Sequence, residues 1–343
     1  MPTRRDPLEH AADGDRDLQG IATWEPRSLV DRLLARYTWL VVRLAVVAFA
    51  ALLFVAELAL LGLQVLASPG SLLVVVLFPL SVLPAAVLAG YVWYTDITNE
   101  PWLLLVGTYV LGVLLATFPT VLNTITLVGI ETFVPEGMVR TVVQIGHFFL
   151  VVAPGEEAAK LAAVFTYAYW HEEFDTVIDG AVYGALAGLG FATIENVSYI
   201  VRVLAGTSGA LELVVGGGII TVVRSIAGPG HVIWTAIAGF HLGLAKFNDE
   251  YWLAITVKGL LVAILLHGTY NSATTLIGGG VEALGLGLLG VPVTFGFIVL
   301  FHTGAFGYLF LKLRRYRRAY AEASPGPEAS PVGDLDGYRE DER

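Results

Sequence analysis

The stretch FFLVVAPGEEAAKLAAVFTYAYW at residues 148–170 decides the fold of this chain, because it sets three charged side chains inside a long apolar block. These are Glu156, Glu157 and Lys160. A charge in the middle of a hydrocarbon layer costs about 2.5–3.5 kcal/mol on insertion scales. Such residues face the interior of a helix bundle and are functional by default, so the stretch indicates a polar site inside a membrane protein.

The composition supports a membrane protein. Of the 343 residues, 56% are hydrophobic and only 15% are charged, whereas a soluble domain carries about 25% charged residues. The absence of cysteine excludes disulfides and a thiol nucleophile. The net charge of −10 argues against nucleic acid as a partner.

The apolar blocks predict an all-α, multi-pass bundle, because a spanning helix needs about 20 such residues. In the sixth block, Pro229 between two glycines predicts a broken or re-entrant entry, with a helix starting at about His231. About eight spans are expected, and spans four to seven carry the site: 39–66, 71–94, 101–128, 141–169, 178–204, 214–245, 252–277 and 284–312.

Basic residues flank both ends of this bundle, with arginines before the first span and KLRRYRR at 312–318 after the last. By the positive-inside rule, both termini are expected on the cytoplasmic side of the cell membrane. We expect three regions. Residues 1–37 form a polar tail, mobile up to residue 27, with a helix that begins at the capping-box sequence SLVD. Residues 38–313 form the bundle, whose catalytic part covers about 140–280, and residues 314–343 form a basic segment and a disordered tail.

The fifth span directs a carboxylate into the bundle. Gly180, Gly184 and Gly188 form a ladder of small residues that allows another helix to approach closely. Glu195 follows Gly188 by two helical turns and therefore shares this face. In the fourth span, Glu156 and Lys160 are four residues apart and share a face as well. The adjacent glutamates repel each other, so we expect one of them to hold a proton.

The sixth and seventh spans contribute histidines to the same polar site. His231 lies in the sixth span, and His267 with Asn271 shares one face of the seventh. Imidazole and carboxylate groups bind zinc, with three protein ligands and an open position for water. A further glutamate could then act as general base and acid. The sequence has no HExxH motif, so the ligands would have to come from separate helices.

The sequences EEAAK, FATIEN at 191–196, the histidine after GPG, and HGTYN together resemble the PrsW family of intramembrane proteases, which is related to the CAAX prenyl endopeptidase and Abi group. The resemblance covers about residues 140–280. It implies an intramembrane endopeptidase in the lipid bilayer that cleaves a membrane-associated protein, such as an anti-sigma factor, in regulated proteolysis. The implied site has Glu156 and Glu157 as the catalytic pair, and Glu195, His231 and His267 as ligands of a divalent metal, expected to be Zn²⁺. In a mechanism without metal, which stays open, Asn271 would donate to the oxyanion.

Another class of function fits the same residues. Carboxylates, histidines and a lysine at the membrane midplane also build the proton relays of ion-coupled transporters. Transporters often contain an internal repeat of spans, and spans four to seven have no counterpart in spans one to three. A non-catalytic scaffold, the third class, would not need adjacent glutamates. These observations favour the protease over the transporter.

Overall fold

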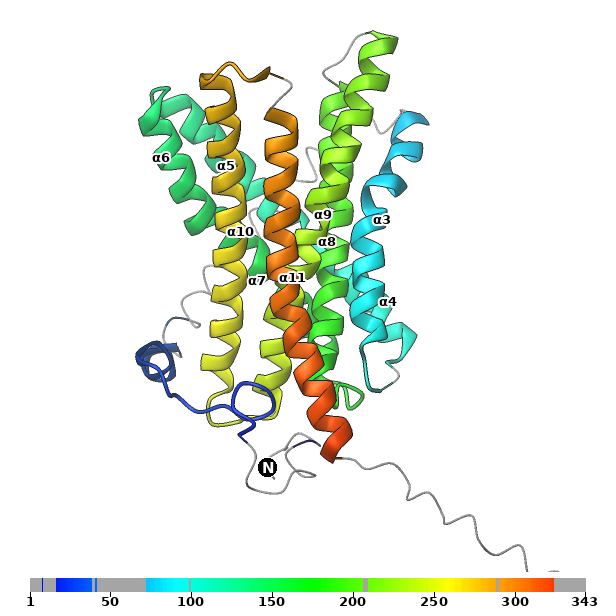
Figure 1. Ribbon diagram of the computed structural model, residues 1–343, viewed down its shortest axis with the longest axis vertical. Helices are drawn as coiled ribbons and strands as arrows, with labels where there is room; N and C mark the ends of the chain where they lie inside the picture. Colours follow the sequence, from blue (N-terminus) through cyan, green and yellow to red (C-terminus); the bar gives the residue numbers. More distant parts are fainter. Residues whose placement is uncertain are drawn as a thin grey trace, which may run out of the picture.

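The computed structural model describes residues 8, 17–38, 41, 72–98, 100–205, 209–287 and 290–323. In this part of the chain the fold is a bundle of helices without a β-strand, which confirms the predicted all-α architecture (Figure 1). The elements are α3 (Leu72–Tyr94), α4 (Trp102–Leu115), α5 (Thr117–Phe133), α6 (Met138–His147), η1 (Phe148–Val152), α7 (Ala153–Thr166), η2 (Ala168–Trp170), α8 (Val177–Ala205), α9 (Ala210–Lys246), α10 (Trp252–Ala283) and α11 (Gly290–Ala323).

Six helical runs in the described residues are long and apolar enough to cross a membrane. They match the second, third, fifth, sixth, seventh and eighth predicted spans. The first predicted span, 39–66, lies outside the described residues except for Val41. The expected disordered tail beyond Ala323 also lies outside them.

The fourth predicted span is built from three consecutive elements, α6, η1 and α7. The five-residue η1 is a π-helical turn that ends just before Pro154. Proline has no backbone N–H to continue the regular ladder, and a π-helical turn accommodates such an interruption without ending the helix. The turn thereby sets the rotation at which α7 presents Glu156 and Glu157.

The sixth span is one continuous helix, so the predicted break at Pro229 is wrong. Helix α9 runs from Ala210 to Lys246 with Pro229 inside it. In hydrocarbon, ending the helix there would expose several backbone groups, whereas a proline removes a single donor. His231 therefore projects from a regular helix near its middle.

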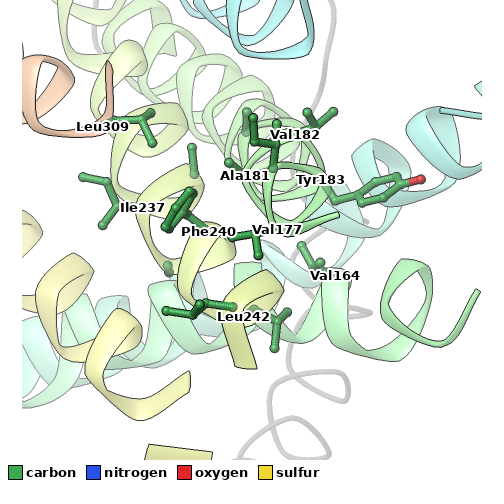
Figure 2. Packing of buried hydrophobic residues seen from close by; sticks show 14 of the residues in the cluster. Val164, Val177, Ala181, Val182, Tyr183, Ile237, Phe240, Leu242 and Leu309 are labelled. Carbon is green, nitrogen blue, oxygen red and sulfur yellow. The ribbon is translucent and has the colours of Figure 1, made fainter. Parts of the chain in front are cut away.

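Helix α8 is the centre of the bundle. In its most apolar window 83% of the residues are buried, compared with 22–39% in the five other runs. The predicted glycine ladder packs on α9, where a Cβ on Gly180 would overlap the Gly239 backbone and one on Gly188 would overlap the His231 carbonyl. Apolar side chains from α7, α8, α9 and α11 pack around this contact (Figure 2).

The segment before the bundle is ordered where the structure describes it, so the expectation of a mobile tail up to residue 27 is wrong for residues 17–27. Trp24 is 4% exposed, and its backbone N–H donates to the side-chain oxygen of Asn248 at 3.0 Å. The capping box is confirmed: the backbone N–H of Ser28 and of Asp31 each donates to the other's side chain at 3.0 Å. This segment and the end of α11 lie at the same end of the bundle (Figure 1).

The ladder gives a test of the fold. A methyl group at Gly184 would overlap the Thr235 carbonyl, so we expect Gly184→Ala to cost about 1–3 kcal/mol of stability through overpacking. Thermal unfolding in detergent, followed by tryptophan fluorescence, measures this cost. Gly218→Ala is the control, because a Cβ at Gly218 meets nothing within 4 Å. Equal melting temperatures for the two variants would contradict the proposed role of the ladder.

Candidate functional site

Helices α7, α8, α9 and α10 bring the predicted site residues to one level, in the middle of the bundle. They surround a cavity of about 270 Å³. Five of the six predicted side chains line it: Glu156, Glu195, His231, His267 and Asn271. Glu157, the sixth, lies directly behind this lining and is fully buried.

Glu157 is held from three sides. Lys160 Nζ donates to its Oε1 at 2.6 Å, His267 Nδ1 donates to the same oxygen at 2.9 Å, and Thr235 Oγ1 donates to Oε2 at 3.2 Å. The Lys160 ammonium is itself fully buried and lies 4.2 Å from the centre of the Phe191 ring. The two opposite charges compensate each other inside the bundle, as predicted from their spacing.

Glu156 has the opposite character, because one of its oxygens accepts no hydrogen bond. Asn123 Nδ2 donates to Oε1 at 3.0 Å. Oε2 is buried and has no hydrogen-bond partner among the described residues, and Glu156 lines the cavity. Oε2 lies 3.7 Å from Lys160 Nζ, 3.8 Å from His267 Nε2 and 4.0 Å from His231 Nδ1.

Each histidine is oriented by a different glutamate. His267 donates through Nδ1 to Glu157, which leaves the lone pair of Nε2 on the side of Glu156. His231 donates through Nε2 to Glu195 Oε2 at 2.7 Å, which leaves Nδ1 on the side of Glu156. These partners assign the two tautomers. Trp234 stacks on His267 at 4.7 Å between ring centres and fixes its plane.

Glu195 is anchored away from the centre of this group. Arg224 contacts its Oε2 at 2.6 Å and also donates to Asn196 Oδ1 at 2.8 Å. Asn196 in turn donates to the Ser81 carbonyl at 3.0 Å and so connects the site to α3. Glu195 thus contacts His231, but the three ligand-type side chains that come together are Glu156, His231 and His267.

The residues present fit a divalent ion of the zinc class. Glu156, His231 and His267 each offer one donor atom to the same group. Glu156 Oε2 lies 3.8 Å from His267 Nε2 and 4.0 Å from His231 Nδ1, both inside the largest separation of about 4.4 Å that two bonds of 2.0–2.2 Å allow. The unpartnered Glu156 Oε2 is an orphaned buried acceptor, which such an ion would satisfy. His231 Nδ1 accepts a hydrogen bond from Lys160 at 2.8 Å, so an ion and this contact would compete.

Several residues of the site were not among the predicted ones. Asn123 comes from a span without a recognised motif, and nothing in its sequence context marks it. Thr235 follows His231 by one helical turn, a spacing that could have found it. Arg224 lies in the predicted sixth span and places a positive charge against Glu195. His147 lines the cavity and bonds Thr126 Oγ1 at 2.6 Å through Nε2.

Comparison with known proteins identifies the family of this chain. The model of a family described as "PrsW family intramembrane metalloprotease" matches residues 100–301. Protease PrsW from Oceanobacillus iheyensis is 30% identical over 188 residues, which cover 55% of this chain and 78% of the relative. Protease PrsW from Bacillus subtilis is 30% identical over 203 residues, 57% of this chain and 80% of the relative. No solved structure matches the chain.

The family match covers more than half of the chain and includes every element that lines the cavity, from α5 to α10. Both relatives are named as proteases. The matched part is a bundle of several apolar helices, with its polar groups near the middle of the bundle. The chain therefore belongs to the PrsW family of intramembrane metalloproteases, which are membrane-embedded peptide-bond hydrolases.

Proposed function

We propose that this protease hydrolyses its substrate at the centre formed by Glu156, His231 and His267, in which the Glu156 carboxylate activates the attacking water, either directly as general base or as a ligand of a bound ion. One observation carries the proposal. Glu156 Oε2, which accepts no hydrogen bond from the described residues, lies 3.8–4.0 Å from one nitrogen of each histidine, and the other nitrogen of each histidine is bound by a glutamate.

The three side chains would hold the ion, with Zn²⁺ as the proposed metal because two histidines and one glutamate form a common catalytic zinc set. When bound, such an ion lowers the pKa of a water molecule towards about 7 and polarises a carbonyl group. The cavity beside the three donors supplies the open position for water and substrate. This set has Glu156 in place of Glu195, which the resemblance had implied as a ligand.

Glu156 and Asn271 supply the proton transfer and the oxyanion stabilisation. In the mechanism without an ion, Glu156, kept in place through Oε1 by Asn123, takes the proton of the attacking water at Oε2 and passes it to the leaving amine. With an ion bound, Oε2 would be one of its ligands, and the ion would supply the activation of the water. Asn271 lines the same cavity one helical turn after His267. Its side-chain amide is the proposed donor to the oxyanion.

Glu157 and Glu195 act as positioning residues in this scheme. A carboxylate on the far nitrogen of a ligand histidine fixes its tautomer and ring orientation and makes it a better donor. Lys160 and Arg224 each bring a positive charge against these carboxylates. This compensation lets three glutamates share a site with little access to water.

The substrate is a membrane protein, and its entry route follows from the cavity. Among the lining residues, Arg202 lies in the last turn of α8 and Thr275 in the second half of α10. These two helices end on the side of the bundle opposite the described N-terminal segment (Figure 1). With the termini in the cytoplasm, as the basic flanks indicate, substrate and water would enter from the outer side. The proposed substrate class is a membrane-anchored regulatory protein of the anti-sigma type, because the resemblance implies it. Membership of a protease family favours this function over the coupled transporter.

Glu156→Gln tests the general base. Glutamine keeps the shape and the bond to Asn123 but cannot take a proton, so we expect proteolysis to fall by about 10²–10⁴-fold while the melting temperature stays near that of the wild type. Cleavage of a membrane-protein reporter in proteoliposomes measures the activity. Glu131→Gln, on an exposed residue of α5, is the control. Wild-type cleavage by Glu156→Gln would refute the proposed mechanism.

His267→Ala tests the ligand set by a second readout, bound metal measured by mass spectrometry on the purified protein. We expect this variant to lose both metal and cleavage, because one of three donors is gone. Glu157→Gln should keep the donors but weaken metal affinity by about 10–100-fold, the usual effect of an outer partner. His171→Ala, in an exposed loop, should match the wild type. Metal-free wild-type protein that still cleaves would favour the mechanism without an ion.

A further inference from the structure

A second group of acidic side chains lies far from the catalytic cavity, where the connection between α3 and α4 meets the start of α8. Asp96 and Glu100 come from the connection and Asp179 from the first turn of α8. One carboxylate oxygen from each lies within 4.8 Å of the other two. This is the end of the bundle that also carries the described N-terminal segment and the end of α11 (Figure 1).

Asp179 is fixed by the start of its own helix. The backbone N–H groups of Asp175 and Thr176 both donate to Asp179 Oδ2 at 2.7 Å, and the Thr176 hydroxyl donates to Oδ1. This is a capping arrangement, so helix formation alone explains why Asp179 is there. It does not explain why two further carboxylates approach it.

Glu100 and Asp96 each direct an unsatisfied oxygen into the group. Glu100 is only 8% exposed. Its Oε2 accepts a hydrogen bond from the fully buried Tyr183, and its Oε1 is buried with no donor among the described residues. Figure 2 shows the Tyr183 hydroxyl pointing away from the apolar cluster. Asp96 Oδ1 accepts from the Ile97 N–H at 2.8 Å, and its Oδ2 is likewise buried with no donor in the described part of the chain. Both carboxyl groups lie within hydrogen-bonding range of the Asp179 carboxyl group.

Among the described residues, no lysine, arginine or histidine forms an ion pair with these three carboxylates. The ion pairs in this part of the chain all involve other acidic residues. Lys246, whose charge acts on the neighbouring Asp175, donates to the carbonyls of Tyr169 and His171 at 2.6 and 3.0 Å. Burial raises the pKa of Glu100 to about 7 and that of Asp96 to about 6. Ionised carboxylates here lack a counter-charge, and unpaired buried charges are costly.

We propose that Asp96, Glu100 and Asp179 bind a divalent cation of the Ca²⁺ and Mg²⁺ class, separate from the catalytic ion. All donors are oxygens, which these hard cations prefer and zinc-type sites rarely use alone. Two Ca²⁺–O bonds of 2.3–2.6 Å can join oxygens up to about 4.6–5.2 Å apart, which accommodates the observed spacing. The cation would satisfy both orphaned oxygens and supply the missing charge.

The position of this cation gives it a structural role. It would tie the connection between α3 and α4 to the first turn of α8, the helix that carries the glycine ladder and Glu195. Binding would therefore stabilise the bundle without touching the catalytic residues, and its effect can be measured without any substrate.

The test measures thermal unfolding of the purified full-length protein in detergent after treatment with a chelator. His267→Ala serves as the parent, because it lacks a catalytic metal ligand. CaCl₂ and MgCl₂ are each titrated against KCl of equal ionic strength. At an ion concentration about 100 times the dissociation constant, we expect the melting temperature to rise by about 5 °C and then to saturate. Adding Glu100→Gln should weaken the apparent affinity at least tenfold.

The control is Glu173→Gln, which removes one exposed charge from the adjacent loop and should leave the ion response unchanged. Asp96→Asn is the second test variant, for use if Glu100→Gln does not fold. The proposal is overturned if neither ion raises the melting temperature beyond KCl, or if the variants at Asp96 and Glu100 respond like the parent. Either result would mean that the carboxyl groups share protons and need no cation.

Discussion

The close contact between α8 and α9 is the constraint on which the rest of the site depends. Glycines on both helices let the backbones touch, and a single added methyl group would overlap a carbonyl of the partner helix. Packing rather than hydrophobicity holds helices together in a bilayer, so this interface fixes the rotation of both helices. His231 lies against Gly188, and Glu195 lies two turns beyond it, which brings their side chains to 2.7 Å.

Charge compensation is the second requirement. Three glutamates meet at mid-depth in the bundle, and Lys160 and Arg224 each contact one of them at 2.6 Å. Glu156 Oε2 lies beside both histidines without a hydrogen bond, and Lys160 Nζ is 3.7 Å from it. The ion pairs thus serve the chemistry indirectly, because they keep Glu157 and Glu195 engaged as partners of the histidines.

Much of this arrangement follows from sequence, because hydrocarbon imposes simple rules. Long apolar runs predicted the spans, the glycine spacing predicted the face of Glu195, and the SLVD sequence predicted a capping box that the structure confirms. Local rules failed where tertiary contacts or the membrane override them. Pro229 is accommodated within a continuous α9, and residues 17–27 are held by contacts with residues more than two hundred positions away.

Sequence analysis also could not predict which side chains from other helices contact each polar group. Asn123 reaches Glu156 from a helix without a motif, and the group formed by Asp96, Glu100 and Asp179 depends on how a loop folds against α8. Spacing along one helix predicts neighbours on that helix. It does not predict which side chain of another helix will lie opposite. For this reason the resemblance implied Glu195 as the third donor, whereas the proposed third donor is Glu156.

Anomalous diffraction from crystals of the full-length protein grown with zinc tests the central claim most directly. The proposal predicts one strong peak among His231 Nδ1, His267 Nε2 and Glu156 Oε2, about 2.0–2.2 Å from each atom. A proteolytically active sample with no peak at this position, or with its metal bound elsewhere, would contradict the claim that these three side chains form a metal-dependent hydrolytic centre.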